Sequence, residues 1–213
     1  VYATGNYEHN KLGIYNLSGD LRIPTKVPSF LGASVVAVSA GTNHGLALYY
    51  TTNAASSGDN SYGQLGNGNL LETTAIQTVE ASGIFDISAG YNHSMVTNQT
   101  GTLYVFGDNS LGQLGLGGMN DGTIQYISKP TANEMFLSNV YAMSISAGNK
   151  FSTFADRNGV VYGFGDYTQG NGTEFGLDTI ETRSDTPVMI GESRLVAGDN
   201  EVTVVSDGDE VKL

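Results

Sequence analysis

Two histidines and three aspartates are the residues of this sequence best suited to chemistry, and they recur at regular intervals. His44 and His93 are 49 residues apart, as are Asp59 and Asp108, and Asp166 follows a glycine as the other two aspartates do. Imidazole side chains bind transition metals and exchange protons near neutral pH. Aspartates act as general acids or bases. Residue type alone therefore leaves both kinds of chemistry open.

The other copies of these positions favour a structural role. The third copy of the histidine position holds Phe151, and the fourth holds Glu201. A polar residue that recurs with a repeated motif is most simply part of the scaffold, and aspartates after a glycine stabilise turns through local hydrogen bonds. We predict that these histidines and aspartates make hydrogen bonds within their own or adjacent repeats. The sequence thus predicts no catalytic, metal or cofactor site.

Other chemical motifs are missing or fit poorly. The chain has no cysteine, which removes disulfides, cysteine-ligated zinc and thiol catalysis. It contains no phosphate-binding glycine loop, Gly-x-Ser-x-Gly elbow or His-Glu-x-x-His pattern. Asp207-Gly208-Asp209-Glu210 gathers three carboxylates, but their spacing does not match a calcium loop, so we expect a solvated turn. We predict that the chain is not an enzyme.

The recurring residues belong to a repeat of about 50 residues. Each of three copies has Ser-Ala-Gly, and the glycine of that motif lies 17 residues before a second glycine. The glycine pairs are Gly41 and Gly58, Gly90 and Gly107, and Gly148 and Gly165. Such a fixed offset within a long period is typical of propellers and solenoids. A further copy of the first motif ends at Gly198, and a degenerate copy of the second opens the chain at Val1.

Each 17-residue segment reads as strands joined by tight turns. Ser-Ala-Gly supplies small side chains, which suit an innermost strand beside a crowded central channel. Residues 45–49 and 93–97 are expected to form second strands. Residues 103–106 and 160–164, rich in β-branched and aromatic side chains, are expected to form third strands. Asn158-Gly159 before the last of these is a strong hairpin signal.

The compound motif resembles the regulator of chromosome condensation repeat. The resemblance is carried by Ile87-Ser-Ala-Gly-Tyr-Asn-His-Ser94 with Gly101-Thr-Leu-Tyr-Val-Phe-Gly-Asp-Asn-Ser-Leu-Gly-Gln-Leu-Gly-Leu116, and by the copy that ends Gly58-Asp-Asn-Ser-Tyr-Gly-Gln-Leu-Gly66. It covers nearly the whole chain, with degenerate first and last copies. The resemblance implies a β-propeller with four-stranded blades, commonly seven of them.

We therefore expect one all-β domain over residues 1–213, a β-propeller of about four repeat units that is part of a larger ring or assembly. The expected units are residues 1–34 with the C-terminal strands, 35–83, 84–142 and 143–193, with 194–213 completing a blade with 1–13. The two ends either pair with each other or meet additional protein. Because seven blades are usual in the family, we rank self-closure last.

Composition limits the partners. The formal net charge of −12 repels phosphate backbones, so no nucleic-acid partner is expected. The sequence has no run of 18 apolar residues, so no membrane insertion is expected either. Few lysines, many Ser, Thr, Asn and Gly residues and no cysteine favour an extracellular or cell-surface location over the cytoplasmic alternative.

Length varies between repeats only after Gly-Gln-Leu-Gly, and the longest insertion spans about residues 116–137. Repeat proteins place such insertions on one face, which is often the binding face. The candidate partner-facing residues are Met119, Asn120, Asp121 and Tyr126. Four Asn-x-Ser/Thr sequons permit glycosylation at Asn16, Asn92, Asn98 and Asn171.

Two classes of function remain. The first is a non-catalytic, protein-binding or structural scaffold propeller, secreted or displayed on a surface as a module of a larger extracellular assembly. The alternative is an intracellular regulatory propeller, such as a small-GTPase exchange factor. The resemblance reaches both, because members of the family include an exchange factor for the GTPase Ran and a secreted inhibitor of β-lactamase. In both classes the partner is a protein or further copies of the chain.

Overall fold

The computed structural model describes residues 1–15, 17–30, 34–117, 124–134, 140–166, 183–193, 203–206 and 209–212. Within these ranges the chain is almost entirely β-structure, which confirms the expected fold class. The exceptions are two short 3-10 helices, η1 (Glu8–Asn10) and η2 (Pro28–Phe30). No helix in the same ranges has the length and hydropathy needed to cross a membrane.

Three antiparallel sheets repeat one strand order and form three blades. The first blade contains β3 (Val35–Ala40), β4 (His44–Tyr49), β5 (Ala54–Gly58) and β6 (Thr73–Thr78). The second contains β7 (Ile84–Ala89), β8 (His93–Asn98), β9 (Leu103–Asp108) and β10 (Tyr126–Ala132). The third contains β11 (Ala142–Ala147), β12 (Phe151–Asp156), β13 (Val160–Asp166) and β14 (Arg183–Ser193). Strands that follow each other in sequence are neighbours in each sheet, as in propeller blades.

Shorter pieces of sheet lie at the two ends. β1 (Tyr2–Gly5) pairs with β2 (Leu21–Lys26), while β15 (Thr203–Ser206) and β16 (Asp209–Lys212) extend the third blade beyond β14. By the repeat, β1 corresponds to the third strands β5 and β9. Among the described residues, β1 pairs with β2, and β15 pairs with β14 and β16. The unit boundaries and the joint blade of residues 194–213 with 1–13 stay predictions.

The turns between second and third strands explain where the hairpins form. In the second and third blades, Gly101 (φ 79°) and Gly159 (φ 83°) adopt the left-handed conformation that the turn requires. The first blade has Thr52 at the equivalent position, with φ 63°. A β-branched residue in this region of φ/ψ space is strained, whereas glycine is not. The hairpin signal at Asn158-Gly159 therefore marks a real turn.

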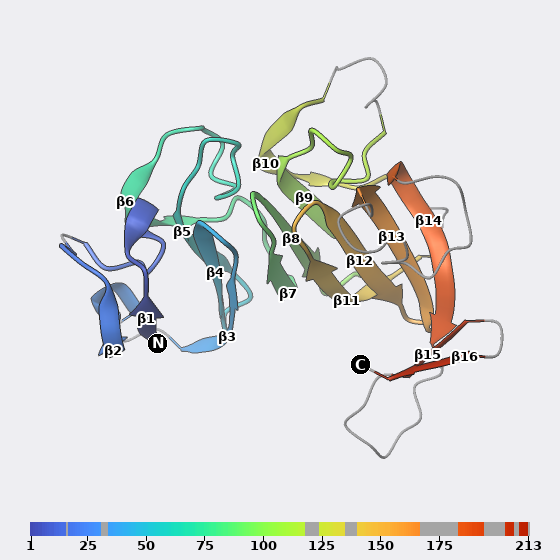
Figure 1. Ribbon diagram of the computed structural model, residues 1–213, viewed down its shortest axis with the longest axis horizontal. Helices are drawn as coiled ribbons and strands as arrows, with labels where there is room; N and C mark the ends of the chain where they lie inside the picture. The colour runs from blue at the N-terminus through green and yellow to red at the C-terminus, as the bar shows by residue number, and fades with distance from the viewer. Residues whose placement is uncertain are drawn as a thin grey trace.

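Two apolar cores lie between the blades. One joins the first and second blades through Leu46, Leu48, Ile87, Val96 and Phe106, with further buried neighbours. The other joins the second and third blades through Met95, Leu103, Val105, Ile145, Phe154 and Phe164. Figure 1 shows the three blades side by side, with β1 and β2 beyond the first blade and β14 to β16 at the opposite end. The second blade thus contributes one face to each of the two cores, and the first and third blades contribute to one core each.

Candidate functional site

His44 connects the first two blades. Its Nε2 atom lies 2.8 Å from the Ser94 hydroxyl on β8, and that hydroxyl donates to the Gln64 carbonyl oxygen at 2.8 Å. Because the serine proton goes to Gln64, the His44 Nε2–H must be the donor to Ser94. The Gln64 carbonyl belongs to the loop that follows β5. These two hydrogen bonds therefore join the first blade, through its second strand and the loop after β5, to the second strand of the next blade.

The same connection recurs one blade further on. His93 Nε2 lies 2.9 Å from the Ser152 hydroxyl, which donates to the Gln113 carbonyl at 2.7 Å. Both imidazoles are fully buried. Burial lowers the pKa of His44 to about 4. For His93, burial together with the neighbouring His44 lowers the pKa to about 3. Both rings are neutral at physiological pH, and each uses its one N–H in this connection.

The aspartates that recur after a glycine organise the loops that supply those carbonyls. Asp59 accepts hydrogen bonds from the backbone N–H and hydroxyl of Ser61 at one oxygen and from the Gln64 amide at the other. Partial burial raises the pKa of this carboxyl, but the hydrogen bonds from Ser61, the charge of His9 and the hydrogen bond from Gln64 outweigh it and leave the pKa below its usual value. Asp108 likewise accepts from the Ser110 N–H at 2.9 Å. The hydrogen bonds predicted for these histidines and aspartates, within their own or adjacent blades, are thus present. That these residues have no catalytic or metal-binding role stays a prediction.

Two further sets of hydrogen bonds flank the histidine connection. Near the channel, the Ser39 hydroxyl accepts from the Ala89 N–H at 3.0 Å, and Ser88 accepts from Ala147 at 2.9 Å. Near the outer edge, the Gly68 N–H donates to Ser128 O at 2.9 Å and the Gly117 N–H to Asp185 O at 2.7 Å. Each junction between blades therefore carries inner, middle and outer hydrogen bonds at equivalent residues.

Metal chemistry has no visible site in the described part of the chain, since no group of three or more His, Cys, Asp or Glu side chains is placed to hold an ion.

The loops after the third strands and the turns between first and second strands share one face of the propeller. The backbone N–H groups of Asp59, Asp108 and Asp166 each donate to the residue just before a second strand, at 2.8–2.9 Å, and this fixes the two sets of loops beside each other. At the channel mouth on this face, a hollow of about 390 Å³ is lined by Ala40, Gly41, Thr42, Ala89, Gly90, Tyr91, Ala147, Gly148 and Asn149.

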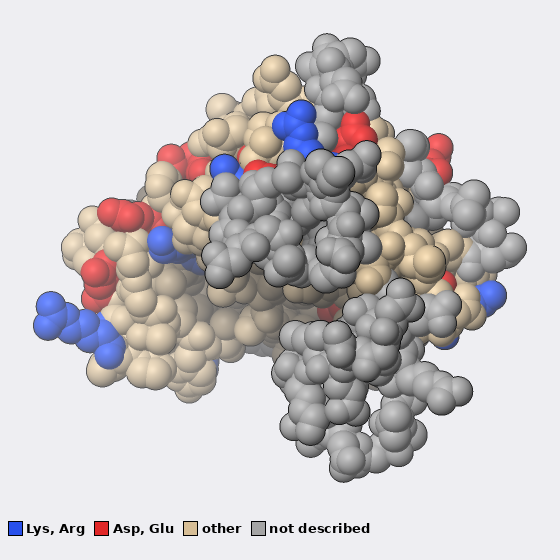
Figure 2. All heavy atoms as spheres, turned by 45° about the vertical axis from the view of Figure 1, so that its right-hand side comes forward, with Lys and Arg blue, Asp and Glu red and all other residues tan. Residues whose placement is uncertain are grey.

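Exposed tyrosines gather on the same face. Tyr62 lies in the loop after β5, Tyr91 in the turn before β8 and Tyr126 at the start of β10, and all three are exposed. The first loop contacts β10, because a Cβ at Gly63 would lie 2.5 Å from Ser128 Cα. We call the surface formed by Tyr62, Tyr91, Tyr126 and the channel-mouth residues Thr42 and Asn149 the loop face. Figure 2 shows acidic and basic side chains interspersed among uncharged residues, with no large basic patch among the coloured atoms of that view.

The structure describes only some of the residues predicted to face a partner or to carry a glycan. Tyr126 is 46% exposed and belongs to the loop face. Met119, Asn120 and Asp121 lie outside the described residues, as do the sequon residues Asn16 and Asn171.

The other two sequon asparagines are described. Asn92 precedes β8, and its side-chain oxygen is buried without a hydrogen-bond partner. The Asn98 oxygen accepts from the N–H groups of Thr100 and Thr102 and closes the β8–β9 turn. Glycosylation at these positions stays a prediction.

Sequence reasoning missed Ser94 and Ser152, the partners of the two histidines. They occupy equivalent repeat positions, which was the available signal. The first blade has Gly45 at this position, so the pattern is broken in one of three copies. There Ser57, at the position of Phe106 and Phe164, donates instead to the Lys11 carbonyl at 3.2 Å.

Antiparallel four-stranded blades placed side by side along a shared channel define a β-propeller. The chain belongs to the regulator of chromosome condensation (RCC1) repeat family, whose repeat pattern matches residues 1–48, 56–97 and 100–155. A second pattern of the same repeat matches residues 86–113. The resemblance drawn from the motifs is confirmed. A search of curated protein sequences found no match to the chain.

Solved structures with this fold are longer than the chain. Human WBSCR16 is 22% identical with a TM-score of 0.76, and the match covers 97% of this chain and 54% of that one. Prp20p from Saccharomyces cerevisiae is 23% identical with a TM-score of 0.72, covering 97% and 51%. Yeast RCC1 (Prp20) bound to Kap60 is 24% identical with a TM-score of 0.73, covering 96% and 49%. The chain thus spans about half the length of these structures. The Prp20p structure was described with its binding properties to Gsp1p and histones.

Proposed function

We propose that this chain is a non-catalytic, protein-binding propeller of the regulatory kind, whose partner docks on the loop face. The observation that carries the proposal is the use of the recurring polar side chains in the junctions between blades. His44, His93 and Asp59 are held by hydrogen bonds that join or organise the blades. Such groups serve the scaffold and are not free for acid–base work. Function then rests on the parts of the surface that differ between repeats.

The chemistry of the loop face suits a protein partner. Tyrosine is enriched at protein–protein interfaces because it combines a large apolar ring with a hydroxyl that forms hydrogen bonds. Tyr91 lines the hollow at the channel mouth, and Tyr62 and Tyr126 are exposed on the same face, in the loop after β5 and at the start of β10. Loops on a rigid scaffold are also where binding residues concentrate. Tyr126 of this face also belongs to the longest insertion of the sequence, about residues 116–137.

The net charge of −12 favours a basic partner. Prp20p, which shares this fold, is described with its binding to Gsp1p and histones, and histones are strongly basic proteins. The comparisons thus support the regulatory alternative, with its cytoplasmic or other intracellular location, better than the extracellular scaffold that composition favoured. We propose a basic protein surface of the histone kind as the partner, with a small GTPase of the Gsp1p kind as the second candidate.

Binding to purified core histones and to purified Gsp1p, each measured by biolayer interferometry, tests this function. We expect saturable binding to histones, weakened at least tenfold by the combined substitutions Tyr62→Ala, Tyr91→Ala and Tyr126→Ala. Tyr50→Ala is the matched control, because Tyr50 is exposed in the β4–β5 turn at the other end of the blade. Saturable binding to Gsp1p alone would move the proposal to the second candidate. No binding to either protein, or equal losses with the control, would overturn it.

A further inference from the structure

The loop that connects β5 to β6 carries two exposed leucines. Leu70 is 38% exposed and Leu71 is 73% exposed. Thr73, the first residue of β6, pairs with Gly58 at the end of β5, so the two leucines lie at the loop-face end of the first blade. We call Leu70 and Leu71 the leucine tip.

One buried asparagine holds the backbone of the leucine tip. The Asn60 side chain has no exposed surface, and its Nδ2 atom lies 3.0–3.3 Å from four oxygens of the loop. These are the carbonyl oxygens of Asn69 and Leu71 and the side-chain oxygens of Asn67 and Asn69. The Asn69 side-chain oxygen also accepts from the Leu71 N–H at 2.8 Å. The backbone on both sides of Leu70 is therefore fixed, although the leucine side chains are exposed.

The second blade shows which part of this arrangement belongs to the repeat. In both blades the asparagine Oδ1 accepts from the N–H of the leucine in Gly-Gln-Leu-Gly, at 3.1 Å for Asn60 and at 3.0 Å for Asn109. Among the described residues, the Asn109 nitrogen donates to one carbonyl oxygen, that of Ile124, at 3.1 Å. The asparagine oxygen thus organises the turn in both blades. The four contacts of the Asn60 nitrogen are particular to the loop of the leucine tip.

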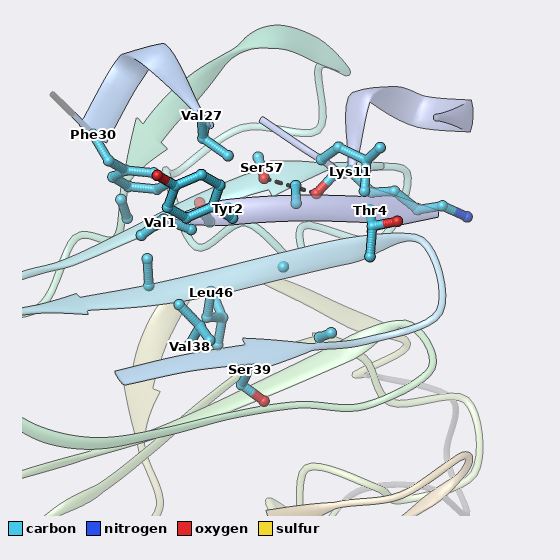
Figure 3. A pocket seen from close by; sticks show the side chains of 17 residues that line it. Val1, Tyr2, Thr4, Lys11, Val27, Phe30, Val38, Ser39, Leu46 and Ser57 are labelled. Carbon is cyan, nitrogen blue, oxygen red and sulfur yellow. Dashed lines mark hydrogen bonds between the residues drawn. The ribbon is translucent and has the colours of Figure 1, made fainter. Parts of the chain in front are cut away.

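A carboxylate next to the leucine tip is held in place as well. Glu72 lies 3.5 Å from His9 Nδ1, and about half of its side chain is exposed. His9 belongs to the loop after β1, which is fixed on the first blade by the hydrogen bond from the Ser57 hydroxyl to the Lys11 carbonyl oxygen at 3.2 Å, drawn as a dashed line in Figure 3. The first blade therefore presents two apolar side chains with a negative charge beside them.

This combination of order and exposure suits an interface. A leucine side chain gains nothing from the hydrophobic effect while it stays in water. A loop that is already ordered loses less conformational entropy on binding than a loop that must first be ordered. The net charge of −12 and the carboxylate of Glu72 both favour a cation on the partner.

We propose that the leucine tip is an anchor that enters an apolar pocket of a protein partner, with Glu72 beside a lysine or arginine at the rim of that pocket. Asn60 is the positioning residue, because it holds the loop in the conformation that binds. The inference rests on the proposed function, since it describes how the basic partner of the loop face is recognised.

Biolayer interferometry with purified core histones and purified Gsp1p tests the anchor. Leu71→Ala should weaken binding about tenfold or more, because it removes most of a side chain that becomes buried in the complex. Ile23→Ala is the matched control. Ile23 is 72% exposed on β2, and the substitution removes the same number of carbon atoms, so the affinity should not change.

The charge beside the tip has its own pair of variants. Glu72→Gln should weaken binding roughly threefold at low salt and less at high salt, because an exposed ion pair is screened. Glu80→Gln is the control, because Glu80 is about equally exposed and forms an ion pair with Lys129 at 3.1 Å. Its loss should leave the affinity unchanged.

Hydrogen exchange separates the positioning residue from the anchor. Asn60→Ala and Asn109→Ala both remove the acceptor for a leucine N–H, but only Asn60→Ala releases the leucine tip. Asn60→Ala should speed exchange of the Leu71 amide and weaken binding, and Asn109→Ala should do neither. Leu71→Ala, at an exposed position, should weaken binding without faster exchange in the loop.

The outcomes distinguish this inference from the proposed function. Binding of either protein that Leu71→Ala leaves unchanged, or weakens no more than Ile23→Ala does, would overturn the anchor and leave the proposed function standing. Binding of neither protein to the wild-type chain would overturn both. A wild-type dimer in light scattering that Leu71→Ala dissociates would assign the leucine tip to a contact between copies, which would also overturn the proposal.

Discussion

The neutral histidines at the blade junctions make the stability of the protein sensitive to acid. In an unfolded chain both rings titrate near pH 6.5, whereas burial lowers the folded pKa of His44 to about 4 and that of His93 to about 3. The unfolded state therefore binds more protons than the folded state below pH 6.5. Stability from these rings is complete above pH 6.5 and declines as the pH falls towards the folded pKa values.

We expect the free energy of unfolding to fall by about 2 kcal/mol for each histidine between pH 6.5 and pH 5, at 1.36 kcal/mol for each pH unit. Urea unfolding at the two pH values measures the loss. The double variant His44→Phe and His93→Phe is the control, because the third blade carries Phe151 at this position. A wild-type chain that loses no stability in this range, or loses as much as the control, would contradict the role of the rings.

Thr52 is strained in the turn where the other blades have glycine. Its φ of 63° lies in the left-handed region, which costs a β-branched residue about 1 kcal/mol. Thr52→Gly should therefore raise the free energy of unfolding by up to about 1 kcal/mol. Thr51→Gly, in the same exposed turn but not in the left-handed region, should be neutral or destabilising. Thermal unfolding of the two variants measures these changes in stability. Equal changes in the two variants would contradict backbone strain at Thr52.

At the scale of elements, the loop that ends in Gly-Gln-Leu-Gly is fitted against the next blade. Gly66 has φ 64°, and a Cβ there would lie 2.7 Å from the Phe106 ring. Gly83 has nearly the same φ, 67°, with no atom within 4 Å of a Cβ. Gly83→Ala should therefore cost only the backbone strain, about 1 kcal/mol.

Gly66→Ala should cost about 1–3 kcal/mol more, because the added methyl must displace Phe106 in the core between blades. Chemical denaturation of the two variants measures this difference directly. Equal losses would mean that the contact with Phe106 is relaxed at little cost and does not fix the loop.

The elements were more predictable from the sequence than the contacts between them. Strands, hairpins and blade class follow from local signals, such as the Asn158-Gly159 turn and the small residues of Ser88-Ala89-Gly90. The serine partners of the histidines could not be predicted so easily. Each serine lies about one repeat away in sequence from the histidine that it contacts. The first blade has Gly45 at the serine position, so the serine does not recur in every copy.

At the scale of the whole molecule, the acidic charge should govern the strength of partner binding. The net charge of −12 attracts a basic protein through a field that salt screens within about 8–10 Å at physiological ionic strength. We expect the affinity for core histones to fall by about tenfold between 50 mM and 200 mM sodium chloride. Interferometry across this range measures it, with a charge-neutral osmolyte as the control for viscosity. An affinity independent of salt would mean that tyrosine contacts alone support the complex.

The junctions between blades also bear on how such a chain can change over generations. Each of the two complete junctions uses the same serine-to-amide, histidine-to-serine and glycine-to-carbonyl contacts at equivalent positions. A duplication or loss of one whole repeat therefore creates a junction whose complementary side chains already exist. Such a change in repeat number needs few new contacts between blades. The first blade departs from this shared pattern, because Gly45 stands at the position of Ser94 and Ser152. Ser57 there donates its hydroxyl to the Lys11 carbonyl instead.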